Sequence, residues 1–358
     1  MIESTGHVIS YVEALYQSMR WALEANDETL ILGQGVDDHK GIFGTTAGLA
    51  DDFGRERVMD TPLAEEGTTG IAVGAALNGL YPITTHIRAD FVLLAANQIV
   101  NLAAKYKYMF GGRYEVPMLI RAVVGRSWGQ GAQHSQSLQS LFAHIPGLVV
   151  VMPSSPATVL DTYKHVIGKV RAPVISFEHR LLYNLDFQVS DLDYDFEDPL
   201  RSRLVREGLD VTIVATSIMV LEARRAAEYL AKEAMIDCEI IDLHCVSHPD
   251  QGMIVDSVRK TGRLLIADTS WSSYGVAAEI CRMVCETGPH ILERPVISLG
   301  MAEAPCPTAK ALEDIYYPNL ANLVDAAARL ATGRDDHGVT LPNETSMTDI
   351  YKKFRGPF

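Results

Sequence analysis

Two adjacent acids, Glu65 and Glu66, stand at the join between a short apolar run and a long run of small residues. The stretch RVMDTPLAEEGTTGIAVGAA (57–76) predicts a short strand, a turn and then a glycine-punctuated helix. A helix of this Gly/Ala/Val composition is expected to be buried, which would bring at least one of the carboxylates into or near the protein interior. An ionised carboxylate is costly to bury without a partner, so an acid at this place needs an explanation.

A histidine in a polar loop, His134, is the second candidate for chemistry. It lies in GAQHSQSLQSLFAHIPG (131–147), which follows a predicted strand. A histidine among small polar residues is more often a hydrogen-bonded structural residue, but this position also suits a proton donor at the lip of a cleft. The nearby Ser135 and Ser137 do not indicate a serine hydrolase, because the G-x-S-x-G motif is absent.

The glycine-rich stretches do not match the known phosphate-binding motifs. GQGVDDHKGIFGTTAGL (33–49) follows a predicted strand but lacks the third glycine of a dinucleotide-binding fingerprint, and GxxxxGK[ST] is absent. The sequence also has no GDG-type acidic loop of the kind that binds a magnesium diphosphate. As phosphate cradles these stretches are weak candidates.

The elements that must position these residues alternate between strand-like and helix-like runs. Strand-like runs occupy 28–35, 81–87, 116–125, 148–153 and 172–179, and in the second half 211–217, 238–246, 263–270 and 294–301. Helix-like runs occupy 8–26, 91–110, 155–170, 219–234, 249–260 and 275–287, and Ser155 is a predicted N-cap. This alternation predicts an α/β fold of two domains, each with a mainly parallel sheet covered by helices.

Composition limits the classes of function. A chain of 358 residues favours two domains, and its net charge of -14 argues against non-specific binding to nucleic acid. No apolar run approaches the ~20 residues of a membrane span. The start lacks a basic region followed by an apolar one, so we expect a cytoplasmic location. The five cysteines show no metal-ligand spacing and are expected to be buried, reduced side chains.

Several long motifs, in the same order along the chain, resemble one family. They are GIFGTTAGLADDFGRERVMDTPLAEEG, ANQIVNLAAKYKYMFGG, GAQHSQSLQSLFAHIPGLVVVMP, APVISFEHRLLYN, DVTIVATS, GRLLIADTSW and APCPTAKALEDIYYP. This pattern, from about residue 8 to 332, is similar to the beta subunits of thiamine-diphosphate-dependent 2-oxo acid dehydrogenase first components, of pyruvate, branched-chain and acetoin types. The resemblance implies a transketolase-like pyrimidine-binding domain (1–190), a connector (191–209), a transketolase C-terminal-like domain (210–333) and a polar tail (334–358).

The resemblance gives one of the two acids a role. Glu65 matches the family's cofactor-activating glutamate, which hydrogen-bonds the 1′ ring nitrogen of the aminopyrimidine. That bond favours the imino tautomer, which removes the proton from the thiazolium carbon, and the acid works best when poorly solvated. Glu66 is expected to be a solvated acid at the helix start, where the helix dipole favours a negative charge.

Four further positions are carried over from the family. Leu63, Ile87 and Phe91 match positions that pack around the aminopyrimidine ring, with Phe91 as the stacking aromatic. His134 matches the active-site histidine of the HSQS motif, which is expected to assist proton handling or acyl transfer. From local sequence alone, the three apolar residues would be ordinary core residues.

The missing diphosphate loop is informative once the family is considered. The family divides the cofactor site, and an alpha subunit contributes the half that holds Mg²⁺ and the diphosphate. The resemblance therefore implies an α2β2 heterotetramer in which this chain is inert alone. The second domain would serve mainly in subunit association, and in the family it also helps dock a lipoyl acyltransferase core.

The sequence departs from the family pattern at several positions. Arg88, after the strand at 81–87, could form a salt bridge with a substrate carboxylate or pair with Asp90, and both alternatives remain open. Val170 and Ala172 replace the Asp and Asn typical of the family's monovalent-cation loop, which puts a structural K⁺ in question. Asp268 stands where the family often has Glu, a mild change.

The sequence therefore predicts the beta subunit of a 2-oxo acid dehydrogenase. With an alpha subunit it would decarboxylate a 2-oxo acid oxidatively and transfer the acyl group to a lipoyl group. One alternative, favoured by the departures at 85–88, is a thiamine-diphosphate-dependent carboligase or acyl transferase with a non-lipoyl acceptor. Another is a non-catalytic scaffold subunit, which the retention of both Glu65 and His134 opposes. The sequence does not identify the 2-oxo acid.

Overall fold

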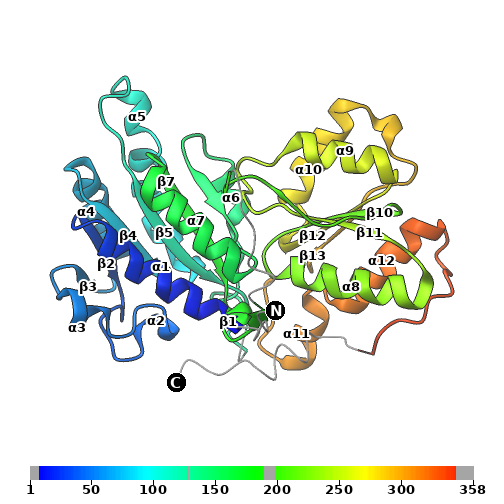
Figure 1. The fold of residues 1–358 in the computed structure, drawn as a ribbon, viewed down its shortest axis with the longest axis horizontal. Coiled ribbons are helices and arrows are strands. Elements are labelled where there is room, and N and C mark those ends of the chain that lie inside the picture. Colours follow the sequence, from blue (N-terminus) through cyan, green and yellow to red (C-terminus); the bar gives the residue numbers. More distant parts are fainter. Residues whose placement is uncertain (1–7, 127–128, 189–197, 344–358) are drawn as a thin grey trace, which may run out of the picture. The chain divides into compact units, whose positions relative to one another are not determined.

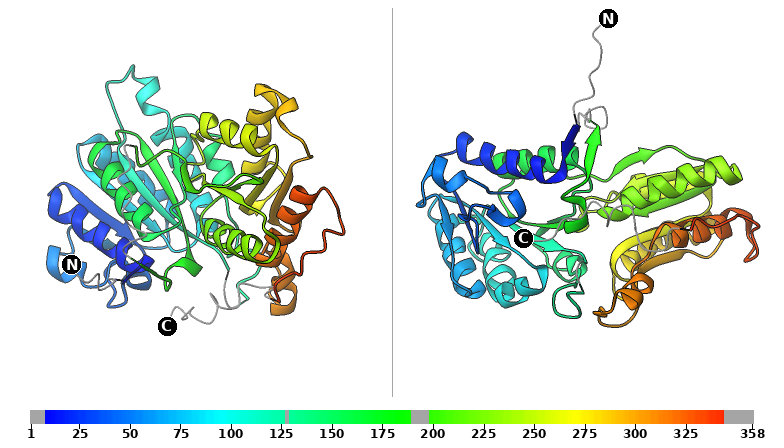
Figure 2. Two further views of the ribbon diagram at one scale, coloured as in Figure 1. Left: turned by 45° about the vertical axis from the view of Figure 1, so that its right-hand side comes forward. Right: turned by 90° about the horizontal axis from the view of Figure 1, so that it is seen from below.

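The chain forms two compact units with separate sheets (Figure 1). The computed structural model describes residues 8–126, 129–188 and 198–343. Of these residues, unit 1 comprises 8–124, 141–188 and 198–200, and unit 2 comprises 125–126, 129–140 and 201–343. Each unit has helices on both faces of its sheet, so the α/β fold expected from the sequence is confirmed (Figures 1 and 2).

Unit 1 is built on a six-stranded sheet in the order β3-β2-β4-β5-β7-β6. Its strands are β2 (Thr29–Gly33), β3 (Val58–Asp60), β4 (Tyr81–His86), β5 (Met118–Val124), β6 (Val149–Val151) and β7 (Pro173–His179). All neighbouring pairs are parallel. Every residue of β4, β5 and β7 is buried, as expected for central strands covered on both faces.

The helices of unit 1 lie in two layers. Helices α1 (Tyr11–Ala25) and α7 (Pro156–Lys169) pack side by side on one face, and α4 (Glu65–Leu77) lies on the other (Figures 1 and 2). Ser155 caps α7 by accepting a hydrogen bond from the Thr158 amide, which confirms the predicted N-cap. The predicted helix at 8–26 begins only at Tyr11, because Val8–Ser10 forms strand β1, antiparallel to β8 (Asp186–Gln188).

The prediction of one continuous helix at 91–110 was wrong. The chain instead forms a 3-10 segment η1 (Ala89–Ala95), a π-helical segment η2 (Gln98–Ala103) and the single turn α5 (Tyr106–Met109). A 3-10 helix has three residues per turn, so it aligns Ala89, Val92 and Ala95 on one face, and all three are buried. An α-helix, with 3.6 residues per turn, would not keep these three in register.

A buried ion pair joins β5 and β7 at the centre of unit 1. Arg121 and Glu178 are fully buried and bonded twice, with Nε–Oε1 2.7 Å and Nη2–Oε2 2.9 Å. The phenols of Tyr163 and Tyr183 also donate to the Glu178 carboxylate. Burial, and then the negative charge of Glu178, raise the pKa of both tyrosines, so they stay neutral donors.

Breaking this pair should strongly destabilise unit 1. In Glu178→Gln the Arg121 guanidinium stays buried without a counter-charge, so the free energy of unfolding should fall by about 3–5 kcal/mol. The matched control is Glu115→Gln, since Glu115 forms partly exposed ion pairs with Lys107 and Arg171 and should cost less than about 1 kcal/mol. Calorimetric unfolding of the two variants measures the difference, and equal losses would contradict this account.

Unit 2 has a five-stranded sheet in the order β13-β12-β10-β11-β9. Its strands are β9 (Arg203–Arg206), β10 (Val211–Ala215), β11 (Cys238–Asp242), β12 (Leu264–Trp271) and β13 (Ile297–Met301). Only the edge strand β9 is antiparallel. It lies within 191–209, where the sequence indicated a connector. The sequence did not reveal this strand, because the short polar run RLVR belongs to the edge of the sheet and lacks the apolar pattern of a buried strand.

The helices of unit 2 also cover both faces of its sheet. Helices α8 (Ile218–Ala234) and α12 (Leu320–Thr332) pack on one face, and α9 (Gln251–Thr261) and α10 (Val276–Thr287) on the other (Figure 1). The short helices of the chain are α2 (Gly41–Gly44), α3 (Leu49–Phe53), α6 (Gln139–Ala143) and α11 (Lys310–Tyr316). Across the described ranges, no helix is both long and apolar enough to cross a membrane.

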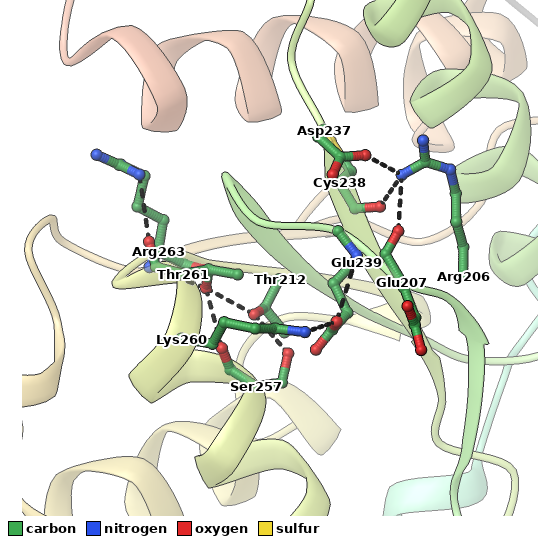
Figure 3. A network of polar contacts seen from close by, with 11 residues as sticks. Arg206, Glu207, Thr212, Asp237, Cys238, Glu239, Ser257, Lys260, Thr261 and Arg263 are labelled. Atoms are coloured by element: carbon green, nitrogen blue, oxygen red, sulfur yellow. Dashed lines mark hydrogen bonds and ion pairs between the residues drawn. The ribbon is translucent and has the colours of Figure 1, made fainter.

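Polar contacts fasten α9 to the amino ends of two strands of unit 2 (Figure 3). The Thr212 hydroxyl on β10 lies 2.7 Å from both the Ser257 and the Thr261 hydroxyls in the last turns of α9. Lys260, from the same turn, pairs with Glu239 on β11. These contacts hold the last turns of α9 against the amino ends of β10 and β11, at the opposite end of the sheet from the residues that follow these strands.

The cysteines and the tail differ in part from the expectation. All five cysteines are free thiols, but Cys285 is exposed and Cys281 half-buried, both on α10, rather than buried. In the tail, the Tyr229 hydroxyl donates to the Thr340 carbonyl at 2.7 Å, so residues before 344 contact unit 2. The expected polar tail beyond 343 lies outside the described residues.

Candidate active site

Five of the six candidate residues lie at the carboxyl edge of the unit 1 sheet. Leu63 and Glu65 follow β3 directly, and Ile87, Arg88 and Phe91 follow β4. Because β3, β2 and β4 are parallel, their carboxyl ends share this edge. Helix α4, which begins at Glu65, packs against both β4 and η1, and η1 contains Phe91. In open α/β sheets, this edge is where ligands bind.

Glu65 and Glu66 differ in their surroundings. Glu65 is half-buried, and among the described residues no hydrogen bond or ion pair reaches its carboxylate. Glu66 is exposed and accepts a hydrogen bond from Gln98 Nε2 at 3.3 Å. The helix is less buried than its composition suggested, since Ile71 on α4 is 67% exposed. Glu65 is therefore a partly desolvated acid, open to a ligand, rather than an interior one.

Large apolar side chains lie exposed near Glu65. Leu63 is 82% exposed and Phe91 is 37% exposed, while Ile87 is half-buried. Exposed apolar side chains beside a single polar group are typical of a ligand-binding surface rather than of an ordinary protein exterior. The local sequence alone predicted core positions here, and for Leu63 and Phe91 that prediction is wrong.

The same edge carries buried positive charge. Arg88 and Arg180, which directly follows β7, are both buried, and the Arg180 guanidinium lies 4.0 Å from the centre of the Phe43 ring. Burial, and then the positive charge of Arg88, lower the pKa of Arg180 to about 9. Asp90 is buried as well, so both alternatives for Arg88 stay open.

His86, the last residue of β4, was not predicted as a site residue. Its side chain is buried, and its Nε2 has no hydrogen-bond partner among the described residues. Burial lowers the pKa of His86 to about 4, so the imidazole is neutral near pH 7. The sequence gave no indication of this burial, because the local pattern around a histidine at the end of a strand is the same whether its side chain is buried or exposed.

The sixth candidate, His134, belongs to unit 2, whereas the other five belong to unit 1. It is half-buried, and its backbone amide donates to the Gly131 carbonyl at 3.4 Å in a tight turn. Three further residues were not predicted to have a role, namely Ser137 and Gln139, which follow His134 in the sequence, and Asp268. These three form a buried hydrogen-bonded cluster within unit 2.

The two halves of the chain match two family models. Residues 7–186 match "Transketolase, pyrimidine binding domain" and residues 201–323 match "Transketolase, C-terminal domain". The chain is also 39% identical over 320 residues to the pyruvate dehydrogenase E1 component subunit beta-2, mitochondrial, of Oryza sativa subsp. japonica, across 88% of this chain and 85% of the relative. The chain belongs to the transketolase-type E1 beta subunits.

One further relative and one solved structure also resemble the chain. The chain is 39% identical over 312 residues to the acetoin:2,6-dichlorophenolindophenol oxidoreductase subunit beta of Cupriavidus necator, across 86% of this chain and 90% of the relative. The solved structure of a split gene transketolase, described as an inactive beta4 tetramer, superposes with a TM-score of 0.73 at 23% identity. It covers 90% of this chain and 98% of its own, and this likeness shows a shared fold.

Proposed function

We propose that this E1 beta-type chain acts with an alpha subunit as a thiamine-diphosphate-dependent 2-oxo acid dehydrogenase. The observation that carries the proposal is the Glu65 carboxylate, which has no partner among the described residues and lies at the ligand-binding edge of unit 1. Relatives that share about two fifths of its sequence are named as subunits of pyruvate dehydrogenase and acetoin oxidoreductase.

The residues at this edge fit the aminopyrimidine half of the cofactor. When bound, thiamine diphosphate supplies a carbon that can attack a 2-oxo group and hold the resulting negative charge. Glu65 would exchange a proton with the 1′ ring nitrogen, a task that suits a partly desolvated, unpaired carboxyl group. Leu63, Ile87 and Phe91 would contact the flat ring, and their exposed apolar surface supports this. His134 would carry a proton at the reacting end.

The rest of the cofactor site is proposed to come from an alpha subunit. This chain has no phosphate-binding motif, so Mg²⁺ and the diphosphate would be held by the partner in an α2β2 assembly. Exposed apolar side chains on α4 and η1, among them Ile71 and Leu94, support a surface that a partner covers. A lipoyl acyltransferase core would then receive the acyl group.

A second candidate keeps the cofactor and changes the acceptor. The buried Arg88 and Arg180, with the neutral His86 close by in sequence, give this edge a polar character that favours an anionic substrate. A carboligase or acyl transferase with a non-lipoyl acceptor would use the same Glu65 chemistry. The two candidates differ only in what receives the acyl group.

Purification of the tagged chain from its native cells tests the function. We expect recovery with an alpha subunit and bound thiamine diphosphate, and reductive acylation of an added lipoyl domain by a 2-oxo acid. The same assembly without lipoyl acylation would favour the second candidate. Recovery of the chain alone and free of cofactor would refute the divided site.

The two adjacent glutamates provide a matched pair of variants. In the reconstituted complex, Glu65→Gln should lower kcat by ~10²-fold or more, because an amide cannot exchange the proton that general acid–base catalysis requires. Glu66→Gln, one residue along, should stay within a few-fold of wild type because Glu66 is solvated. Steady-state kinetics with saturating thiamine diphosphate measures both. Equal activity of the two variants would remove Glu65 from the mechanism and favour a scaffold role.

The two alternatives for Arg88 give opposite results in Arg88→Met. If Arg88 binds the substrate carboxylate, KM for the 2-oxo acid should rise about 10-fold or more, since a charge-assisted hydrogen bond contributes about 1.5–3 kcal/mol. If it pairs with Asp90, the melting temperature should fall while KM changes little. Asp90→Asn serves as the control, because only the second alternative predicts a matching loss of stability. We expect the change in KM.

A further inference from the structure

The segment that carries His134 is fastened at its start to unit 2. Gly129 and Gly131 have φ values of 66° and 69°, in the left-handed region that glycine tolerates. A Cβ atom on Gly129 would lie 2.5 Å from the Thr308 carbonyl oxygen, and one on Gly131 would lie 3.0 Å from Thr308 Oγ1. The backbone therefore passes Thr308 at a distance that only glycine allows.

The end of the same segment is held by a buried carboxylate. Gln139 Nε2 donates to Asp268 Oδ1 at 2.9 Å, and neither side chain is more than 2% exposed. Asp268 also accepts hydrogen bonds from the Thr216 hydroxyl at 2.6 Å, the Thr269 amide at 2.8 Å and the Ser270 hydroxyl at 2.7 Å. Among the described residues no cation pairs with Asp268, so neutral donors alone hold this carboxylate.

The contacts of Asp268 fix which way the Gln139 amide points. A carboxylate only accepts, so the NH₂ of Gln139 faces Asp268, and its Oε1 must then accept from the Ser137 hydroxyl, 2.8 Å away. The Ser137 hydroxyl in turn lies 3.0 Å from Thr269 Oγ1. The resulting closed set of hydrogen bonds specifies one arrangement of residues 137–139.

The position of Asp268 follows from an irregularity in β12. The pairing of β12 with β13 is regular up to Ala267 and shifts before Trp271, so residues 268–270 leave the ladder at the carboxyl end of the parallel sheet. Such irregularities re-aim side chains at sheet ends. Thr216, which follows β10, lies at the same end. The carboxyl edge of the unit 2 sheet thus supplies the anchor for the His134 segment.

We propose that Gln139 and Asp268 are positioning residues that hold His134 in its working place. His134 lies five residues before Gln139 and three after Gly131, within a short segment fastened at both ends. The inference rests on the proposed function, in which His134 handles a proton. It gives the transketolase C-terminal-type domain a part in catalysis beyond subunit association.

The sharpest test is Gln139→Glu, which keeps the shape of the side chain and replaces its NH₂ donor with a carboxylate oxygen. At pH 8 two carboxylates then face each other, and their repulsion should release the segment. At lower pH one of them takes up a proton, because like charges raise the pKa of the pair, and the hydrogen bond returns. In the reconstituted holoenzyme we expect kcat to fall on the order of 10²-fold at pH 8, with little change in KM, and to recover toward pH 6.

An activity-independent readout accompanies the kinetics. Hydrogen exchange of peptides covering residues 129–138, measured by mass spectrometry in the assembled complex, should quicken in Gln139→Glu at pH 8 and slow again toward pH 6, relative to wild type. Gln133→Glu is the matched control, because it adds the same charge to the same segment at an exposed position without facing Asp268. Its peptides should exchange like those of the wild type.

A second variant serves if Gln139→Glu does not assemble. Ser137→Ala removes one hydroxyl and should lower kcat a few-fold with faster local exchange. In Gln139→Glu/Asp268→Asn only one carboxylate is left, and it faces an amide that can donate to it, so kcat at pH 8 should recover in part. The recovery stays incomplete because the Thr269 amide loses its acceptor.

Two results would overturn the inference. Wild-type kcat and exchange in Gln139→Glu at pH 8 would show that the bond to Asp268 does not hold the segment. A loss of kcat that is equal at pH 6 and pH 8, with a lower melting temperature and no local change in exchange, would assign Gln139 to stability alone. If the wild-type complex turned over no 2-oxo acid while exchange still followed pH, the proposed function would fail and the anchor would stand.

Discussion

All six strands of the unit 1 sheet run in one direction, and the place of every candidate residue in that unit follows from this. Parallel strands end at a common edge, so residues that follow β3 and β4 meet there although more than twenty residues separate Glu65 from Ile87. The central strands β4, β5 and β7 are buried on both faces and cannot bind a ligand along their length. Only their ends and the loops after them are available for chemistry.

This arrangement requires a stable interior beneath the edge, and the two units achieve it differently. In unit 1 the buried Glu178 is balanced by a full positive charge on Arg121, with phenols completing its hydrogen bonds. In unit 2 the buried Asp268 has only hydroxyl and amide donors. In unit 1, loss of either charge would leave the other charge buried without a partner. The arrangement in unit 2 depends on donor geometry, which makes it sensitive to the segment that supplies the Gln139 amide.

The sequence predicted what depends on neighbouring residues. The parallel strands of the two large sheets, the Ser155 cap and the strand–turn–helix at Glu65 follow from periodicity and capping over a few residues, whereas β1 and β9 do not. The η1–η2 segment was misread because its period is set by the surface that it packs on. The bond between Gln139 and Asp268 joins residues 129 apart, so no local pattern could reveal it. The motifs of the family suggested the proposed role of Glu65, which composition alone could not.

The hydrogen bonds of the carboxylates separate structural from chemical acids. Glu178 and Asp268 accept from several donors each, and a ligand would have to displace these to reach them. Glu65, on the first turn of a helix with exposed apolar neighbours, has no such donors among the described residues. A carboxyl group left unpaired costs stability unless a ligand or partner completes it. The fold therefore places its one incomplete acid of the three where parallel strands end, which is where the proposed cofactor would supply the missing hydrogen bond.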